Sequence, residues 1–344
     1  MKDNKADIID VARAANVSPS TVSRSFNHPD LVKAATRKKI DAAVRKLGYI
    51  RNRAAQTIHG IRSGTIGLIV PTIDHTIFGE LIQSFSEAVD KYGFTILLAS
   101  HGYNLEREYD LIRKMLEHRV DGVALVGLDH SADTFELLAQ QETPTLLLWN
   151  YSEVSKLSCV GSDNFQAGSL IAEHIIELGH QKIAGVFPPL GDNDRASQRF
   201  AGVQQVLESH KCSIPPEWLL QTRYSVGAAK KAVAELLEQS DKPTAIICGN
   251  DVLAWGALHA LRKSELSAPS DVSIAGIGDF SGSAEFEPSL TTVRIPASNI
   301  GSKAAEVIAD LITSDSSTLS RTLFSPALIQ RDSTTLNSAI AGDD

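Results

Sequence analysis

The residues whose types and spacing could do chemistry lie within the first 30 positions of the sequence. Ser20, Arg24 and Asn27 are spaced i, i+4 and i+7, so on an α-helix they would form one polar stripe. A hydroxyl, a guanidinium and an amide are groups that hydrogen-bond to phosphates and to base edges in the major groove of DNA. The stripe therefore indicates a surface that binds nucleic acid, provided that a helix positions it.

Catalytic patterns are absent from the sequence. It contains no Walker A loop and no H-E-x-x-H, C-x-x-C or G-x-S-x-G motif. In the segment 276–282 the third glycine falls one residue too late for a dinucleotide-binding loop. The ten histidines do not stand at zinc-ligand spacing, and the three cysteines predict reduced thiols rather than a disulfide framework. We therefore expect no enzyme, no cofactor and no metal site.

Helical signals around the polar stripe predict a three-helix head. Ser18 can cap a helix that begins with Pro19, and Gly48 can end a third helix over about 34–47. A first helix is expected from apolar residues at helical spacing, namely Ile8, Val11, Ala12 and Ala15. Two short helices joined by a tight turn fit a helix-turn-helix that binds DNA, and a helical cap that binds protein is the alternative.

Charge is divided unevenly along the chain. Residues 1–64 carry 13 lysines or arginines and five aspartates, a formal charge of +8, whereas the whole chain carries −8 and the remainder therefore −16. A basic head on an acidic body suggests that the head binds a polyanion. The composition changes near residues 60–64, just before the first strong strand signal.

The segment 9–27 resembles the start of regulators of the LacI/GalR family, whose pattern D-V-A-x-x-A-x-V-S-x-x-T-V-S-R-x-x-N is complete from Asp10 to Asn27. The resemblance implies that Pro19 and Ser20 form the variable pair that selects the operator sequence. Lys33 stands where the family often has a capping serine. The DNA-binding residues implied in the head are Ser18, Pro19, Ser20, Thr21, Ser23, Arg24 and Asn27.

The segment 52–60 is too short to form a stable isolated helix, which needs roughly 12–15 residues. A plain linker is one interpretation. The segment is also similar to the family's hinge, which implies that it orders on DNA with Ile58 as an apolar wedge in the minor groove. The DNA-binding residues implied in the hinge are Asn52, Arg53, Ala55, Gln56 and Ile58.

From Thr65 onward, short apolar strands alternate with amphipathic helices. This pattern predicts an α/β body of two Rossmann-like lobes with parallel sheets, and a ligand cleft at the carboxyl ends of the strands. The body also resembles periplasmic sugar-binding proteins, and the family resemblance extends from about residue 8 to 333. The expected domains are a helix-turn-helix head (1–50), a hinge (51–64), a two-lobed effector-binding and dimerisation domain (65–335) and a tail (336–344).

The family resemblance implies a set of effector-binding residues in the cleft, with the planar guanidinium of Arg199 as the main anchor. The family usually has paired acids where this chain has Gly278 and Asp279, so the first acid is missing. That departure is similar to the family's gluconate-type regulators and favours a sugar acid, besides a neutral sugar and, less favoured, a purine. The implied effector-binding residues are Ile77, Phe78, Asn150, Asn193, Arg199, Tyr224, Asn250 and Asp279.

Together these features predict a homodimeric transcriptional regulator, most simply a repressor, that binds a pseudo-palindromic operator. The sequence shows neither a membrane-spanning stretch nor a signal peptide, so a cytoplasmic location and no membrane partner are expected. A soluble sugar-binding receptor without DNA function is the alternative. Induction and corepression both remain open.

Overall fold

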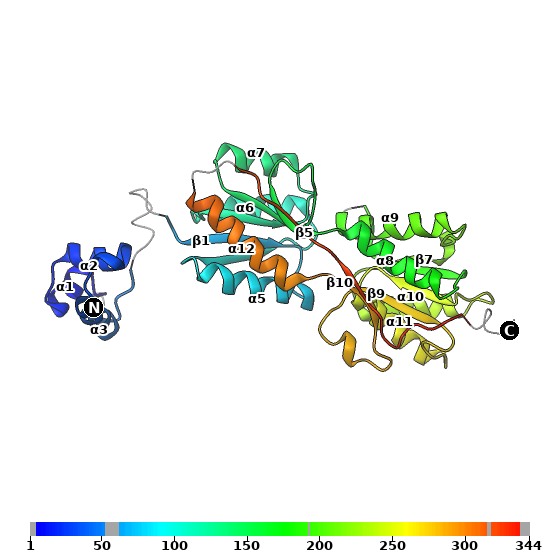
Figure 1. The fold of residues 1–344 in the computed structure, drawn as a ribbon. Helices are drawn as coiled ribbons and strands as arrows, with labels where there is room; N and C mark the ends of the chain where they lie inside the picture. Colours follow the sequence, from blue (N-terminus) through cyan, green and yellow to red (C-terminus); the bar gives the residue numbers. More distant parts are fainter. Residues whose placement is uncertain (1–4, 52–61, 192, 315–317, 338–344) are drawn as a thin grey trace. The chain divides into compact units, whose positions relative to one another are not determined.

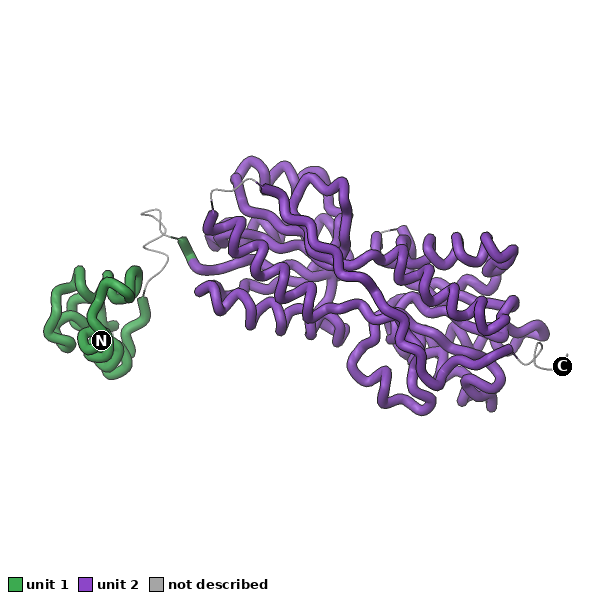
Figure 2. The backbone as a smooth tube through the Cα atoms, viewed as in Figure 1, with its two compact units in different colours: residues 1–63 green, residues 64–344 purple. Residues whose placement is uncertain are grey.

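The computed structural model describes residues 5–51, 62–191, 193–314 and 318–337. The chain forms two compact units, and the boundary in the sequence falls between Ser63 and Gly64 (Figures 1 and 2). Within the described residues, no helix is long and apolar enough to cross a membrane.

The first unit contains the three predicted helices, α1 (Ile8–Ala15), α2 (Pro19–Asn27) and α3 (Ala34–Leu47), with a 3-10 turn at Pro29–Leu31. Val11, Val22 and Ile40, one from each helix, are fully buried in its core. The predicted ends are confirmed, because the Ser18 side chain accepts the Thr21 N–H and Gly48 ends α3 in the left-handed region. Lys33 precedes α3 without a side-chain cap.

Lobe 1 of the second unit is a six-stranded parallel sheet in the order β11-β5-β4-β3-β1-β2. Its strands are β1 (Thr65–Val70), β2 (Thr95–Ser100), β3 (Gly122–Val126), β4 (Thr145–Asn150), β5 (Ser158–Ser162) and β11 (Arg321–Phe324). Helices α5 (Thr76–Asp90) and α12 (Ala297–Thr313) share one apolar core with the sheet. Helices α6 (Leu105–Glu117) and α7 (Ala132–Gln140) share the core on the other face.

Lobe 2 is a second six-stranded sheet in the order β12-β10-β9-β8-β6-β7, parallel except for the pair β10–β12. Its strands are β6 (Ile183–Phe187), β7 (Leu219–Gln221), β8 (Ala245–Cys248), β9 (Ser273–Gly278), β10 (Thr291–Arg294) and β12 (Ala327–Ile329). Helices α8 (Asn164–Glu177) and α9 (Asp194–Ser209) pack together, as do α10 (Val226–Leu237) and α11 (Asp251–Lys263).

The two predicted α/β lobes are thus confirmed, but they are not two consecutive runs of the chain. The chain enters lobe 2 after β5, returns to lobe 1 with α12 and β11, and ends in lobe 2 with β12. Figure 1 shows the returning segments, orange and red, beside elements coloured cyan to green. Three segments of the chain therefore connect the lobes. In the predicted tail, the described Asn337 donates its backbone N–H to Leu178 of lobe 2.

Candidate functional site

Helix α2 presents a hydroxyl-rich, basic face in the first unit. Pro19, Ser20 and Arg24 are exposed, and Thr21 and Ser23 are half-buried. The Ser18 Oγ lies 2.8 Å from both Ser20 Oγ and Thr21 Oγ1, so these hydroxyls form one hydrogen-bonded group at the start of the helix. The predicted head residues therefore lie on one helix and its cap, in positions where they can contact a polyanion.

Asn27 at the end of α2 has a partner that the sequence did not suggest. Its Oδ1 accepts a hydrogen bond from the Arg51 guanidinium, which also lies 5.7 Å from the centre of the Phe26 ring. Its Nδ2 donates to Ser23 Oγ at 3.3 Å. Arg51 therefore occupies one of the two acceptor positions of Asn27 Oδ1.

The predicted hinge residues stay predictions. Asn52, Arg53, Ala55, Gln56 and Ile58 lie outside the described residues.

A cleft between the lobes lies at the carboxyl ends of the strands, as predicted, and it is closed. Its cavity measures about 20 Å³, close to the space that one water molecule occupies. Five of the eight residues predicted to bind an effector line it: Ile77, Phe78, Arg199, Tyr224 and Asn250. Five others that line it were not predicted: His75, Tyr103, Trp149, Arg195 and Phe280.

Arg199 is a buried cation whose guanidinium donates to uncharged groups. Nε donates to Asn164 Oδ1 at 2.8 Å and Nη1 to the carbonyl oxygen of Gly249 at 2.9 Å. The ion pairs among the described residues do not include Arg199. Burial lowers the pKa of Arg199, which shows how poorly its charge is solvated. The cleft therefore offers an anion a buried partner.

Asp251 is a buried carboxylate of lobe 2 that forms no ion pair with Arg199 among the described residues. Asp251 accepts hydrogen bonds from Thr292 Oγ1, Ser283 Oγ and the Phe280 N–H, at 2.6 to 2.7 Å. Burial nevertheless raises the pKa of Asp251, which disfavours its charged form. The donors of these three hydrogen bonds do not include Arg199, and the charge of Asp251 opposes the lowering of the Arg199 pKa by burial.

Asp194 joins the two lobes across the cleft. Its Oδ2 accepts hydrogen bonds from two lobe 1 groups, the Leu128 N–H at 2.8 Å and the Asn150 Nδ2 at 2.9 Å. Its Oδ1 is paired with Arg195 Nη1 at 2.9 Å. Asn150, predicted to contact an effector, therefore uses its amide nitrogen to hold the lobes together, while its Oδ1 is buried without a partner among the described residues.

Two further predicted residues support the cleft instead of lining it. Asn193 caps α9 by accepting the Ala196 N–H and donates to the Tyr224 hydroxyl at 3.1 Å. Asp279 is held by Arg294 at 2.6 Å and Arg331 at 2.7 Å. In this closed conformation Asp279 is not among the residues that line the cavity, and its contact with an effector stays a prediction.

Gly278 stands at the position of the missing acid, and the backbone there leaves no room for a side chain. Its φ of +138° is a conformation that side chains rarely adopt, and a Cβ at this position would overlap the Phe280 ring. Phe280 itself lines the cavity. An aromatic ring therefore stands beside the position where the family usually has a carboxylate.

Aromatic rings form much of the cleft wall. The centre of the Tyr224 ring lies 5.0 Å from that of His75 and 5.8 Å from that of Tyr103, and those of Phe78 and Trp149 are 5.2 Å apart. Such faces can pack on the apolar side of a sugar ring. Burial raises the pKa of Tyr103 and lowers that of His75, so both are neutral near pH 7. Their positions in loops after β1 and β2 carry no periodic signal in the sequence, which is why they were missed.

Hydrogen-bonding atoms without partners gather on neighbouring residues. They are Trp149 Nε1, Asn150 Oδ1, Ser162 Oγ and Asn164 Nδ2, all buried and all without a partner among the described residues. Asn150 and Ser162 are paired across β4 and β5. Unsatisfied buried polar groups are costly, and of these four residues Trp149 lines the cavity. No group of metal-binding side chains occurs among the described residues.

Two different family models match the chain, one in each unit. Residues 7–52 match the family model described as bacterial regulatory proteins, lacI family. Residues 172–334 match the model of a periplasmic binding protein-like domain.

Relatives cover nearly the whole chain. It is 28% identical over 330 residues to the HTH-type transcriptional repressor PurR of Klebsiella pneumoniae subsp. pneumoniae, covering 95% of this chain and 96% of that protein. It superimposes with a TM-score of 0.84 on a lac repressor dimer bound to operator and the anti-inducer ONPF, at 26% identity over 96% of this chain and 100% of that one. The transcription regulator GntR from Chromobacterium violaceum gives a TM-score of 0.74 at 28% identity, covering 78% of this chain and 99% of that one.

Proposed function

This chain belongs to the LacI/GalR family of transcriptional regulators, and from that premise we propose that it represses transcription as a homodimer on a pseudo-palindromic operator, under the control of a small molecule between its lobes. The hydroxyl and arginine face of α2 supports DNA recognition through residues 18–27. Action on DNA supports a cytoplasmic location, and the family is one of repressors rather than enzymes. The hinge residues 52–58 would order only on the operator.

Arg24 tests how α2 recognises DNA. We expect Arg24→Ala to weaken binding to an operator, selected from random duplexes, by about 1–3 kcal/mol if Arg24 contacts a base. Fluorescence anisotropy with labelled operator and a scrambled duplex measures both affinities. Arg13→Ala on α1 removes the same charge from an exposed side chain and serves as the control. Equal losses on both duplexes would make Arg24 a phosphate contact.

The effector that fits the cleft best is a sugar acid. The buried Arg199, whose hydrogen-bond partners are uncharged, is the observation that supports an anion. The aromatic rings of the cleft wall and the unpartnered Trp149 Nε1 support a polyhydroxylated body for the ligand. Gly278, in place of a carboxylate, reduces repulsion of an anion.

A thermal-shift screen tests the effector class with four sets of compounds: sugar acids, neutral sugars, phosphorylated sugars and purines. A ligand at 100 times its Kd stabilises the protein by about 2.7 kcal/mol, which raises the Tm measurably. We expect stabilisation by a sugar acid and none by its neutral sugar. Stabilisation by neutral sugars or purines alone would reject the anionic ligand and leave the regulator assignment intact.

Control of DNA binding would work through the lobes. A sugar acid is larger than the closed cavity, so its entry has to part the lobes at the Asp194 contacts with Leu128 and Asn150. The lobes would then settle in a different relative position. In a dimer, that movement would change the spacing of the two hinges and so their ability to order on the operator.

A further inference from the structure

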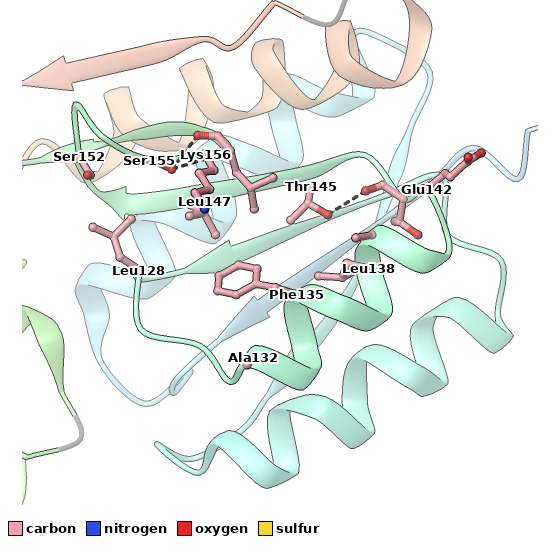
Figure 3. A pocket seen from close by; sticks show the side chains of 13 residues that line it. Leu128, Ala132, Phe135, Leu138, Glu142, Thr145, Leu147, Ser152, Ser155 and Lys156 are labelled. Atoms are coloured by element: carbon pink, nitrogen blue, oxygen red, sulfur yellow. Dashed lines mark hydrogen bonds between the residues drawn. The ribbon is translucent and has the colours of Figure 1, made fainter.

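Lobe 1 contains a second hollow, far larger than the interlobe cavity. It is a groove of about 640 Å³ between α7, strand β4 and the segment 151–157 (Figure 3). This volume lies within the range of about 300–1,000 Å³ that small-molecule sites occupy. The predicted effector residues do not line it.

Apolar side chains form the floor and one wall of the groove. Leu138 of α7 and Leu147 of β4 are almost fully buried in the core beneath it. Phe135, Leu128 and Leu157 pack against the same core while remaining partly exposed. In Figure 3 the Phe135 ring lies between α7 and the strands, facing Leu147 across the hollow.

The hydroxyl groups along the groove are largely used within the protein. Thr145 Oγ1 donates to the Thr143 carbonyl at 2.8 Å, and Ser155 Oγ donates to the Leu157 carbonyl at 2.8 Å. A ligand in the groove therefore meets few polar groups that are available to bind it.

Lys156 is the polar exception. Within the described part of the chain, its ammonium group forms no hydrogen bond or ion pair, and Figure 3 shows its side chain extending over Leu147. The other charged residue at the groove, Glu142, points its carboxylate away from Phe135 and Leu138 in the same view. The groove thus combines an apolar bed with one inward-reaching cation.

From this arrangement we propose that the groove is a second ligand site, which binds a small amphiphilic carboxylate. The carboxylate pairs with Lys156, and the apolar body lies along Leu147, Leu138 and Phe135. Burial of the apolar body supplies most of the affinity, and the exposed ion pair adds selectivity for the anion. A sugar acid does not fit this bed, because its hydroxyl groups would face leucine and phenylalanine side chains.

The test is isothermal titration of the full-length protein with octanoate, and with octanol and octylammonium as matched neutral and cationic probes. Octanoate is expected to bind more tightly than either. Lys156→Gln should weaken octanoate roughly three- to fivefold and leave octanol unchanged. Glu142→Gln, which removes a charge facing away from the groove, should leave octanoate binding within about twofold.

Filling the groove should abolish binding. Ala132→Trp and Ala139→Trp place an indole in it from exposed positions of α7, and each is expected to weaken octanoate more than tenfold. Arg199→Met tests whether octanoate binds in this groove or in the interlobe cleft. Octanoate should still bind that variant. Absence of octanoate binding to the wild-type protein would overturn the proposal. So would unchanged binding in both tryptophan variants, loss of binding in Arg199→Met, or equal affinity for the three probes.

Discussion

Arg199 illustrates how a single residue shapes the chemistry of the cleft. Its guanidinium is held in place by an amide oxygen and a backbone carbonyl, neither of which carries a charge to balance it. A buried cation without an ion-pair partner among the described residues favours a ligand of opposite charge. On the proposed function, the carboxylate of a sugar acid would pair with this guanidinium, and a neutral sugar would not.

Replacing Arg199 should therefore separate ligand binding from folding. We expect Arg199→Met to weaken the sugar acid that stabilises the wild-type protein by roughly 10- to 100-fold, because a charge-assisted hydrogen bond contributes about 1.5–3 kcal/mol. The ligand-free variant should remain folded, since removing a buried charge offsets the hydrogen bonds lost. Calorimetric titration measures the affinity. Wild-type affinity in Arg199→Met would contradict an anion site at this residue, and Lys182→Gln on the exposed surface is the control.

At the scale of elements, the close packing of α8 against α9 positions Arg199. Gly168 of α8 faces the backbone of Arg199, and a Cβ on Gly168 would overlap the Arg199 carbonyl oxygen. Gly202 of α9 meets the Phe165 carbonyl of α8 in the same way. Two glycines thus let the helix backbones approach closely enough for the Arg199 side chain to reach Asn164.

Gly168→Ala should lower the free energy of unfolding by about 1–3 kcal/mol, since the added methyl group forces the helices apart. Gly79→Ala on α5 is the matched control, because a Cβ there meets nothing within 4 Å. It is expected to stabilise the protein by up to about 1 kcal/mol through helix propensity. Urea unfolding of both variants measures the difference. Equal stability of the two variants would show that α8 and α9 can separate without cost.

Sequence periodicity predicted most of these elements and missed those without a strong apolar signal. Strands β1, β3, β6 and β8 are continuous apolar runs and were predicted closely. Strand β5, Ser158–Ser162, is short and rich in serine and glycine, and the membership of α12 and β11 in lobe 1 depends on contacts distant in sequence. Element order along the chain therefore predicted two lobes but not how often the chain crosses between them.

The candidate site was predictable to a similar degree. The family resemblance predicted Arg199 and Phe78 as residues of the cleft. Both lie in the first turns of a helix that follows a strand. Asp279 was expected to contact an effector, and no local pattern predicted its arginine partners 15 and 52 residues away. Tyr103 and Arg51 act through contacts with distant residues, which no local pattern encodes.

At the scale of the whole molecule, buried histidines tie the end of the chain to lobe 2. His174 Nε2 lies 3.0 Å from Thr334 Oγ1, and His180 Nε2 lies 3.0 Å from both Ser273 Oγ and the Thr335 carbonyl oxygen. Burial lowers the pKa of both histidines below the ordinary value of 6.5. The folded protein therefore disfavours their protonated forms.

Stability should accordingly fall in mild acid. Below about pH 6.5 each of these histidines binds more protons in the unfolded chain than in the folded chain, so its contribution to the free energy of unfolding decreases as the pH falls, by up to about 1.4 kcal/mol per pH unit. Urea unfolding at pH 7.5 and pH 5.5 measures this dependence. His180→Asn should reduce it, and His118→Gln, at an exposed position, should leave it unchanged. Stability that rises towards pH 5.5 would contradict this sign.

Binding of DNA by the first unit, under control of the second, is the property on which the regulator assignment depends. Fluorescence anisotropy of a selected operator with the full-length chain and with residues 64–344 tests it most directly. We expect the full-length chain to bind the operator at least about 1,000-fold more tightly than a scrambled duplex. The fragment 64–344 should bind neither duplex specifically. Operator binding that survives removal of residues 1–63 would contradict the assignment.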